Sequence, residues 1–594
     1  MDRDQILSPR TVEGLIADGH TIVIFEDFVL RLDSWLSKHP GGRLPILHMV
    51  GKDATDEINA YHSAATLKTL GAYRIGRKPR GPWLNMTPPI RGGVYRRPSV
   101  TVIDNQPGTP KASNYKADPS ELTVAVTTPP TTPPSSPPTA TATLLRLRVP
   151  PRKGNEPLTP GTDEWDDRSS YGWESGGEKD NEDRDNEKDN SHGLETDQRD
   201  AAAYTEWAVQ QNVRRDLQDY PSVDLSMQQD IVHRYRLLHQ QIQDEGLYEC
   251  RYLEYGKEMI RYVSLFALFL FTLHNAWYMT SAISLGLFWH QIMFTAHDAG
   301  HRAITQKFVP DTLIGMFVAD FCCGLSIGWW KSSHNVHHLV TNSPDHDPDI
   351  QNVPLFATCP SFFRSIHSTY YDFKFAWDAA ADFLVPYQKY TYYPVMGIAR
   401  FNLYLLSWLH VLSSKSSSLG HSKAWWIRPT EILFMACYWF LFGYCLLWRT
   451  LPSWTIRVAF VLVSHVITMP LHVQITLSHW GMSTSDLGES ESFPQRQLRT
   501  TMDVDCPAWL DFIHGGLQFQ TVHHLFPRVP RHNLRRVQEL GLQFSKDTGI
   551  PYTIMKFVDG NKKVLGHLGD IGNQVRILVE CQKYMAKTGE SGLH

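Results

Sequence analysis

Hydrophobic and polar positions divide the chain into three unlike stretches. Residues 1 to about 80 alternate short apolar runs with polar turns, and the run Thr21-Ile-Val-Ile-Phe25 is typical of a strand. Residues from about 85 to 200 contain few apolar positions. Long apolar segments begin only near residue 260. The pattern predicts a small α+β domain at 1–80, a linker at 81–205 and an all-α membrane domain at 206–594.

Four apolar segments in the second half are long enough, or nearly so, to cross a bilayer. The first two are separated by Asn275-Ala-Trp and predict a helical hairpin. Two more apolar stretches, 308–330 and 401–413, are interpreted as re-entrant or interfacial elements, so that both chain ends share one face. The four predicted spans are about 260–276, 278–295, 430–448 and 455–477. We therefore expect a helical bundle with about four transmembrane helices.

The segment before the first span has its own pattern. Thr, Pro and Ser dominate 127–139, and acidic residues outnumber basic ones over 161–200, so a packed core is not expected there. A flexible tether is favoured over a dedicated binding region. After Pro221 a helix is predicted with Ser222 as N-cap. Its apolar face repeats at helical spacing through Ile231, Tyr235, Leu238 and Ile242.

Charge and cysteine content exclude some classes of function. The formal net charge is −4 and no basic face stands out, so no nucleic-acid partner is expected. The mean hydropathy of −0.30 averages a polar first third with apolar segments. Met1 to Arg10 lack the apolar core of a secretory signal. The eight cysteines form no C-x-x-C pair, which fits sites that face a reducing cytosol. Lys and Arg between 331 and 428 favour the cytosolic side for that segment.

Three histidine boxes stand in order in the second half. They read His297-Asp-Ala-Gly-His301, His334-Asn-Val-His337-His338 and Gln520-Thr-Val-His523-His524. Neutral imidazole is a good ligand for transition metals, and residues four apart share one face of a helix. Any single box is weak evidence, because scattered surface histidines give similar spacings by chance. The ordered set beside apolar segments predicts a metal centre at a membrane surface.

The number of histidines favours two metal ions, and the types of ligand favour iron. A single site usually takes about four protein ligands, and the boxes offer seven histidines. Structural zinc would normally use thiolates, and no cysteine lies in the boxes. Gln520 is a weaker ligand, so a supporting role beside the metal is nearly as plausible. His479, at the end of the last apolar segment, is either a further ligand or a satisfied interfacial histidine.

The N-terminal domain contains a second histidine pair. His39-Pro-Gly-Gly42 places His39 on a rigid turn, and His62 follows in Asn59-Ala-Tyr-His-Ser-Ala. This pair resembles the cytochrome b5 haem-binding domain over roughly residues 5–80. The resemblance implies a haem b with His39 and His62 as axial ligands, which transfers electrons rather than binding oxygen. His48 competes less well for the second position, because it lacks the Tyr-His-Ser context.

Residues from about 220 to 575 resemble the front-end membrane desaturases, in which a cytochrome b5 domain precedes the desaturase. Within this family, the run from Gly328 to Ile350 is most similar to fungal delta-8 sphingolipid desaturases. The resemblance implies that a cytochrome b5 reductase passes electrons from NADH to the haem and on to a di-iron site. The box residues His297, His301, His334, His337, His338, Gln520, His523 and His524 would be catalytic, and His479 a further metal ligand.

The implied reaction is an O2-dependent desaturation of the long-chain base of ceramide, on the way to glucosylceramide, at the endoplasmic reticulum with the boxes facing the cytosol. A delta-5 or delta-6 fatty-acyl desaturase and a lipid hydroxylase remain alternatives, since the boxes do not separate these reactions. A haem electron carrier with a degenerate membrane anchor would have damaged boxes. A metal transporter would place ionisable groups within its spans. Double-bond geometry and oligomeric state are not specified by the pattern.

Overall fold

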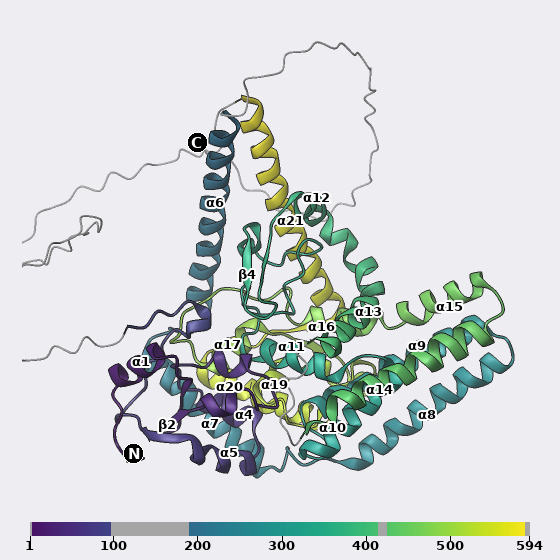
Figure 1. Cartoon of the computed structure of the whole chain (residues 1–594), viewed down its shortest axis with the longest axis horizontal. Helices are drawn as coiled ribbons and strands as arrows, with labels where there is room; N and C mark the ends of the chain where they lie inside the picture. The colour runs from purple at the N-terminus through teal and green to yellow at the C-terminus, as the bar shows by residue number, and fades with distance from the viewer. Residues whose placement is uncertain (1–2, 97–188, 414–423, 589–594) are drawn as a thin grey trace, which may run out of the picture. The chain divides into compact units, whose positions relative to one another are not determined.

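The computed structural model describes residues 3–96, 189–413 and 424–588, which belong to one compact unit. Most of the described residues are helical, and three small sheets accompany the helices. A small α+β domain at the N-terminus precedes a helical membrane domain, so the expected fold class is confirmed (Figure 1). The greater part of the expected linker, 97–188, lies outside the described residues.

The N-terminal domain is built on a three-stranded antiparallel sheet in the order β1-β2-β3. The strand predicted at residues 21–25 is β1, and all of its side chains are buried. Alternate side chains of β1 enter two cores, because successive residues of a strand point to opposite faces. The elements are α1 (Pro9–Ala17), β1 (Ile22–Phe25), β2 (Phe28–Arg31), α2 (Asp33–Leu36), α3 (Leu44–Leu47), α4 (Thr55–Tyr61), α5 (Ala64–Leu70) and β3 (Arg74–Arg77).

Ordered contacts or helical structure extend into both ends of the segment assigned to a linker. Helix α6 (Asp189–Asp219) occupies its last part, so residues 189–205 are helical, whereas the sequence predicts no regular structure there. Three alanines at 201–203 and many Glu, Gln and Arg residues have high helix propensity, which explains the difference. At the other end, Trp83 is buried and its indole donates a hydrogen bond to the carbonyl of Gly51 (2.9 Å).

Helix α7 (Leu225–Asp244) follows the predicted apolar face. Ile231, Tyr235, Leu238 and Ile242 are all buried in a core shared with the third histidine box. The N-cap is Asp224 and not Ser222, whose hydroxyl instead donates to the Asp224 carboxylate (2.6 Å). The helix therefore supports the site region directly.

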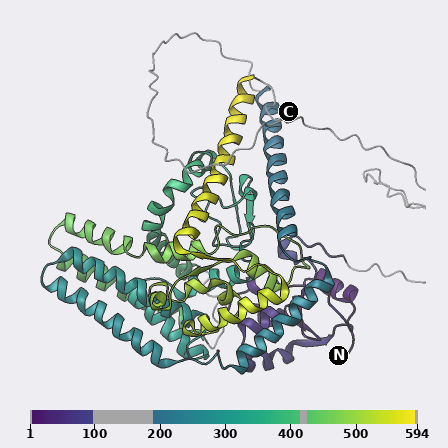
Figure 2. The same cartoon turned by 180° about the vertical axis from the view of Figure 1, so that it is seen from behind.

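Helices α8 (Tyr252–His274) and α9 (Tyr278–Gly300) form the predicted hairpin and lie side by side in both views (Figures 1 and 2). Neither meets a criterion for a membrane span based on length and mean hydropathy. Charged residues in the first turns of α8, and Ser, Thr, Gln and His in α9, lower their hydropathy. Exposed apolar side chains such as Ile260, Val263 and Phe271 nevertheless cover α8.

Three helices are long and apolar enough to cross a membrane, or up to four if one bent pair is a single span. Two of them, Ile427–Thr450 and Trp454–Leu477, correspond to the last two predicted spans. The third, Ala379–Leu412, includes residues 401–413, which the sequence assigned to an interfacial element. That assignment is wrong by length and composition, because the preceding helical residues extend the apolar segment. The helices are α12 (Ala379–Leu384), α13 (Gln388–Leu412), α14 (Ile427–Trp439), a π-helical continuation (Phe440–Thr450), α15 (Trp454–Val466) and α16 (Met469–Leu477).

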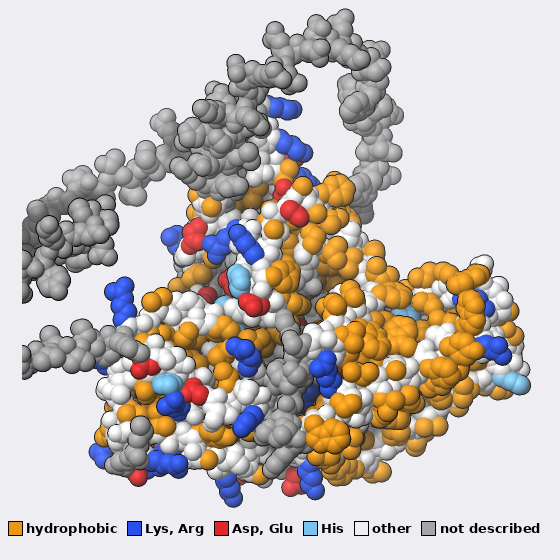
Figure 3. Space-filling view, viewed as in Figure 1, with side chains coloured by type: hydrophobic (Ala, Val, Ile, Leu, Met, Phe, Trp, Pro, Cys, Tyr) orange, Lys and Arg blue, Asp and Glu red, His pale blue; other side chains and the backbone are white. Residues whose placement is uncertain are grey.

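The bent pair carries the second histidine box. Helix α10 (Phe308–Met316) continues as a π-helical turn (Phe317–Cys322), and α11 (Ile327–Leu339) leaves at 115°. This sharp bend is consistent with the re-entrant alternative of the re-entrant or interfacial element expected at 308–330, although the pair could also be one broken span. Figure 3 shows apolar side chains gathered over the region of α8, α14 and α15, as expected for a surface that contacts lipid.

The remaining elements close the site from the C-terminal side. Asp503–Asp505 and Ile554–Lys556 form a two-stranded parallel sheet, and residues 366–375 contain a small antiparallel pair. The elements are β4 (Ile366–Ser368), β5 (Phe373–Phe375), α17 (Phe493–Thr500), β6 (Asp503–Asp505), α18 (Asp511–His514), α19 (Gln520–Leu525), α20 (Leu534–Thr548), β7 (Ile554–Lys556) and α21 (Phe557–Thr588).

Candidate metal centre and haem cavity

The three histidine boxes lie at helix ends that meet inside the protein. His297 is in the last turn of α9, and His301 is the residue that ends it. The second box occupies the C-terminal half of α11, and the third lies on the short helix α19. His479 follows directly after α16. Helices distant in sequence therefore bring all these imidazoles to one buried place.

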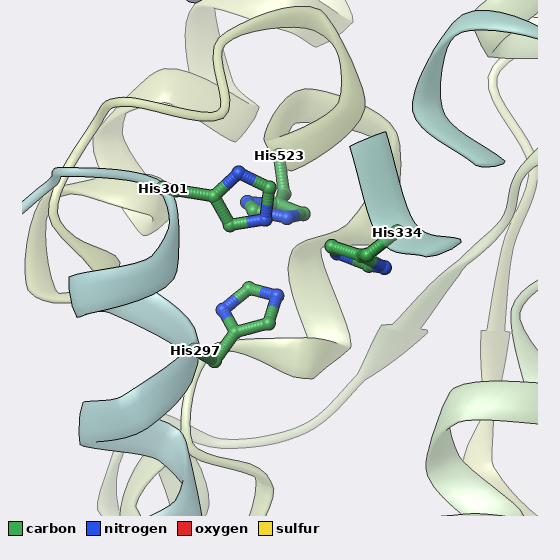
Figure 4. Close-up of side chains that lie close together, drawn as sticks. All are labelled: His297, His301, His334 and His523. Carbon is green, nitrogen blue, oxygen red and sulfur yellow. The ribbon is translucent and has the colours of Figure 1, made fainter. Parts of the chain in front are cut away.

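Four of the histidines form a first cluster. The ligand nitrogens of His297, His301, His334 and His523 all lie within 4.8 Å of one another. Figure 4 shows the four rings directed into a common space from three helices. The Nε2 atoms of His297, His301 and His523 are buried without a hydrogen-bond partner among the described residues. Buried unpaired nitrogens are costly, and a metal ion would satisfy them.

Three further histidines form a second cluster. His337, His479 and His524 bring their ligand nitrogens within 4.8 Å of one another. Each Nδ1 contacts an acceptor: the Asp347 carboxylate for His337 (2.8 Å), the Thr500 carbonyl for His479 (3.3 Å) and the Gln497 amide oxygen for His524 (3.0 Å). These acceptors require Nδ1 to carry the proton, so each Nε2 keeps its lone pair for a metal.

His338 lies between the two clusters. Its Nε2 is 2.9 Å from Nε2 of His334, and its ring stacks on the His524 ring with centroids 4.0 Å apart. Gln520 begins α19 and is buried, while its service as a ligand stays a prediction. The geometry thus brings together all seven box histidines and His479, and divides most of them into two groups.

The start of α11 is fixed by a buried carboxylate. Ser326 caps the helix by accepting a hydrogen bond from the Trp329 amide (2.9 Å). Glu431 of α14 accepts hydrogen bonds from the Ser326 hydroxyl and the Gly328 amide, both at 2.8 Å. A Cβ on Gly328 would lie 2.7 Å from that carboxylate, so a larger residue there would displace the Glu431 side chain. This anchoring sets the register in which α11 presents its histidines.

Several supporting residues were not identified from the sequence. Gln497 links two boxes, because its amide donates to the His338 carbonyl (2.8 Å) while its oxygen faces His524. Asp347 is fully buried behind His337. The signal for Asp347 was present in the acidic run after the second box, Pro344-Asp-His-Asp-Pro-Asp. Nothing local marked Gln497, because it lies far from every box in sequence.

A buried ion network stabilises the end of α9. Arg531 donates to the Asp298 carboxylate (2.8 Å) and to the Phe294 carbonyl (2.7 Å), and it also pairs with Glu258 of α8. Tyr255 of α8 donates to the same Asp298 carboxylate. Asp298 directly follows His297, so the network holds the first box against the loop after the third. Removing one partner of such a buried pair leaves an uncompensated charge.

Burial favours the neutral form of three of these imidazoles. It lowers the pKa of His523, His524 and His479 well below the ordinary value, and neighbouring histidines lower it further. Neutral imidazole is the form that binds a metal ion. The donor set of nitrogens without thiolates fits iron better than structural zinc.

His39 and His62 face each other across a cavity of about 610 Å³ in the N-terminal domain. Their ring centroids are 6.0 Å apart. Nδ1 of His39 donates to the Gly42 carbonyl (2.7 Å), and Nδ1 of His62 donates to the Ile58 carbonyl (2.9 Å). Both Nε2 atoms therefore keep a free lone pair. Burial lowers the pKa of His62 to about 3, so the ring is neutral.

The cavity fits a flat apolar cofactor with two axial ligands. Its walls include Val23, Leu30, Leu32 and Ile46 from the domain core. His48 does not line it and instead packs beside His346, with ring centroids 5.2 Å apart and the rings tilted by 58°. Gly42 has φ of +86°, which only glycine adopts without strain, and this turn carries His39. The residues present therefore fit a haem between His39 and His62.

The membrane domain closes the far side of this cavity. His301 of the first cluster lines the cavity together with His39 and His62. Tyr61, adjacent to His62, has its ring 6.0 Å from the ring of His338. The haem cavity and the histidine clusters are thus separated by single side chains.

Specific contacts hold the N-terminal domain in this position. Arg528 donates to the His62 carbonyl (2.8 Å), next to the third box. Arg236 of α7 pairs with Asp56 (2.7 Å). Lys52 pairs with Glu489 (2.8 Å). Leu339, the last residue of α11, packs against one core of the N-terminal domain.

Comparison with known proteins agrees with this geometry. Residues 275–555 match the family model described as fatty acid desaturase, and residues 8–78 match the cytochrome b5-like heme/steroid binding domain. The chain is 45% identical over 100% of its length, and 99% of the relative's, to a protein of Emericella nidulans named Delta 8-(E)-sphingolipid desaturase. A protein with the same name from Kluyveromyces lactis is 43% identical over 98% of this chain and 95% of its own length. Another from Candida albicans is 41% identical over 98% of both chains. The chain belongs to the fatty acid desaturase family and carries a cytochrome b5-like domain at its N-terminus.

Proposed function

We propose that this enzyme introduces a double bond at the delta-8 position of a sphingolipid long-chain base, with ceramide as the substrate. The observation that carries the proposal is similarity over the whole chain to proteins named Delta 8-(E)-sphingolipid desaturase. Both chemical parts required for the reaction, a histidine centre and an adjacent haem cavity, are present in one unit. The likeness includes the membrane domain, which must recognise the lipid.

We propose that the two histidine clusters each hold one iron ion. His297, His301, His334 and His523 would bind one, and His337, His479 and His524 the other, with His338 between them and Gln520 beside them. Together the bound irons would supply the reduction of O2 to two waters, using two electrons delivered through the haem, two protons from water and two hydrogens from adjacent substrate carbons. The protein contributes orientation, through Asp347 and Gln497, and exclusion of water by burial.

Haem b between His39 and His62 would supply those electrons one at a time. His39 and His62 would hold the haem from both sides, so it would carry electrons and would not bind oxygen. The short separation between this cavity and the clusters supports direct transfer within the chain. A cytochrome b5 reductase that uses NADH would reduce the haem. We place the protein in the endoplasmic reticulum membrane, with the haem domain and the clusters facing the cytosol.

The test is expression in a yeast that makes no unsaturated long-chain bases, followed by mass spectrometry of long-chain bases and fatty acids. His334→Ala serves as the inactive control. A long-chain base two mass units lighter, present with the wild-type chain and absent with the variant, is expected. A new polyunsaturated fatty acid with unchanged bases would instead identify an acyl desaturase. An added oxygen atom would identify a hydroxylase.

A further inference from the structure

Each histidine box is accompanied by one cation that faces the haem cavity. Arg302 directly follows His301 of the first box. Lys331 precedes the second box on α11, and Arg528 follows the third. All three side chains line the cavity that contains His39 and His62, although they belong to the membrane domain.

Positive charge dominates this wall of the cavity. Among the residues that line it, Glu57 of α4 is the single carboxylate. Asp311 lies nearby, but its carboxylate accepts hydrogen bonds from the Thr305 hydroxyl (2.7 Å) and amide (2.9 Å). Within the described ranges, no carboxylate forms an ion pair with Lys331 or Arg302. These three cations are half-buried, and a half-buried charge without an ionic partner is costly, so this wall is suited to an anionic ligand.

Arg528 has a defined position at the junction of the domains. One guanidinium nitrogen donates to the His62 carbonyl (2.8 Å), and another contacts the Gln306 amide oxygen. The guanidinium carbon of Arg302 lies 4.9 Å from the ring centroid of Phe308, which also lines the cavity. Both arginines are therefore positioned by neutral groups, which leaves their charges unpaired.

We propose that Arg302, Lys331 and Arg528 bind the carboxylate groups of the haem, so that the membrane domain completes the haem site. The inference rests on the proposed haem between His39 and His62. A haem presents an apolar ring, suited to the Val23 and Leu30 side of the cavity, and an anionic edge, suited to the cationic side. Arginine binds carboxylates through paired N–H groups, and lysine binds them as a point charge.

This arrangement couples haem binding to docking of the two domains. A cofactor that contacts both domains stabilises their contact, and by reciprocity the docked state binds the cofactor more tightly. It also orients the anionic edge of the haem toward α11 and the end of α9, where the histidine clusters lie. Electron transfer and cofactor retention would thus depend on the same three side chains.

The experiment measures haem release from the purified full-length protein in lipid nanodiscs, using excess apomyoglobin as the haem acceptor. Lys331→Gln and Arg302→Gln remove one charge each. Lys307→Gln is the matched control, because this exposed lysine lies close to Arg302 in sequence and does not line the cavity. Release should be on the order of tenfold faster in the first two variants and unchanged in the control. The midpoint potential should become more negative in the first two, because a lost positive charge favours ferric haem.

A conservative variant separates charge from packing. Lys331→Arg keeps the charge and should restore slow release. If Lys331→Arg releases haem as fast as Lys331→Gln, or if the glutamine variants match the wild type in release and potential, the proposal is overturned. If the wild type binds no haem, or His62→Ala gives the same absorption spectrum, the proposed haem function fails instead. The two failures are therefore distinguishable.

Discussion

Substitution of Asp347 by asparagine tests how the second histidine cluster is organised. Asp347 is fully buried, and one of its oxygens accepts from Nδ1 of His337 (2.8 Å) and from the backbone amide of Asn342 (2.7 Å). Its other oxygen accepts from the Asp349 amide (2.9 Å). Asparagine has the same size but only one acceptor oxygen. In either amide orientation, at least one of these donors therefore meets an NH2 group.

The expected cost follows from those contacts. A buried donor left without an acceptor costs roughly 1–3 kcal/mol. Loss of the carboxylate also frees His337 to adopt the other tautomer, in which Nε2 carries the proton and cannot bind a metal. Changes of this kind typically reduce metal affinity or activity by about 10- to 100-fold. Product formation by Asp347→Asn should fall within that range while the chain still folds.

The assay compares iron per chain and desaturated product for Asp347→Asn and Asp349→Asn. Asp349 is the matched control, since its carboxylate lies 3.7 Å from His337 Nδ1 and its side chain is 28% exposed. Iron content and product should fall for Asp347→Asn and change less than about threefold for Asp349→Asn. Equal losses in the two variants would refute the reasoning. They would indicate that His337, Asp347 and Asp349, whose ligand atoms also converge, form the metal site themselves.

Three further predictions follow from other parts of the structure. His479→Ala should reduce bound iron from two ions to about one per chain, measured by atomic emission, because only the second cluster loses a ligand; full retention of both ions would show that His479 is not a ligand. Glu489→Lys should slow electron transfer from haem to iron, measured by stopped-flow absorbance, without changing the iron content. The substitution replaces the attraction between Glu489 and Lys52 with repulsion between two lysines; an unchanged rate would exclude a role for this contact in docking. Arg531→Met should lower the free energy of unfolding by about 3–5 kcal/mol, because the Asp298 carboxylate stays buried after its cationic partner is removed. An unfolding free energy equal to that of the wild type would contradict the ion network.

The grouping of the histidines could be predicted because most of them are concentrated in short boxes. The order of the boxes and their place at the ends of apolar segments indicated a shared metal centre. How the ligands divide could not be predicted, because His334 and His337 lie on one helix and serve different clusters. That division depends on the 115° bend before α11 and on the anchoring by Glu431. Both are tertiary features without a local signal.

The haem pair was likewise marked by a local motif, whereas the surroundings of the cavity were not. Arg302, Lys331 and Arg528 are ordinary surface cations by sequence. Only docking of two domains, distant in the chain, brings them to His39 and His62. The interpretation of residues 401–413 as an interfacial element also failed. The helix that begins at Ala379 makes this apolar segment long enough to cross a membrane. The length of this helix depends on residues that lie outside the apolar stretch 401–413.

The central claim is that the haem cavity and the two histidine clusters act as one electron-transfer unit for lipid desaturation. The most direct measurement is a single turnover of the purified full chain in nanodiscs that contain ceramide. The chain is reduced without oxygen, so that the haem and both proposed iron ions would each hold one added electron; O2 is then added, and haem absorbance and ceramide mass are followed together. The account predicts rapid haem oxidation with a long-chain base two mass units lighter, and neither change at the wild-type rate in His334→Ala. Haem oxidation at the wild-type rate in that variant, or oxidation of the wild type without a desaturated base, would contradict it.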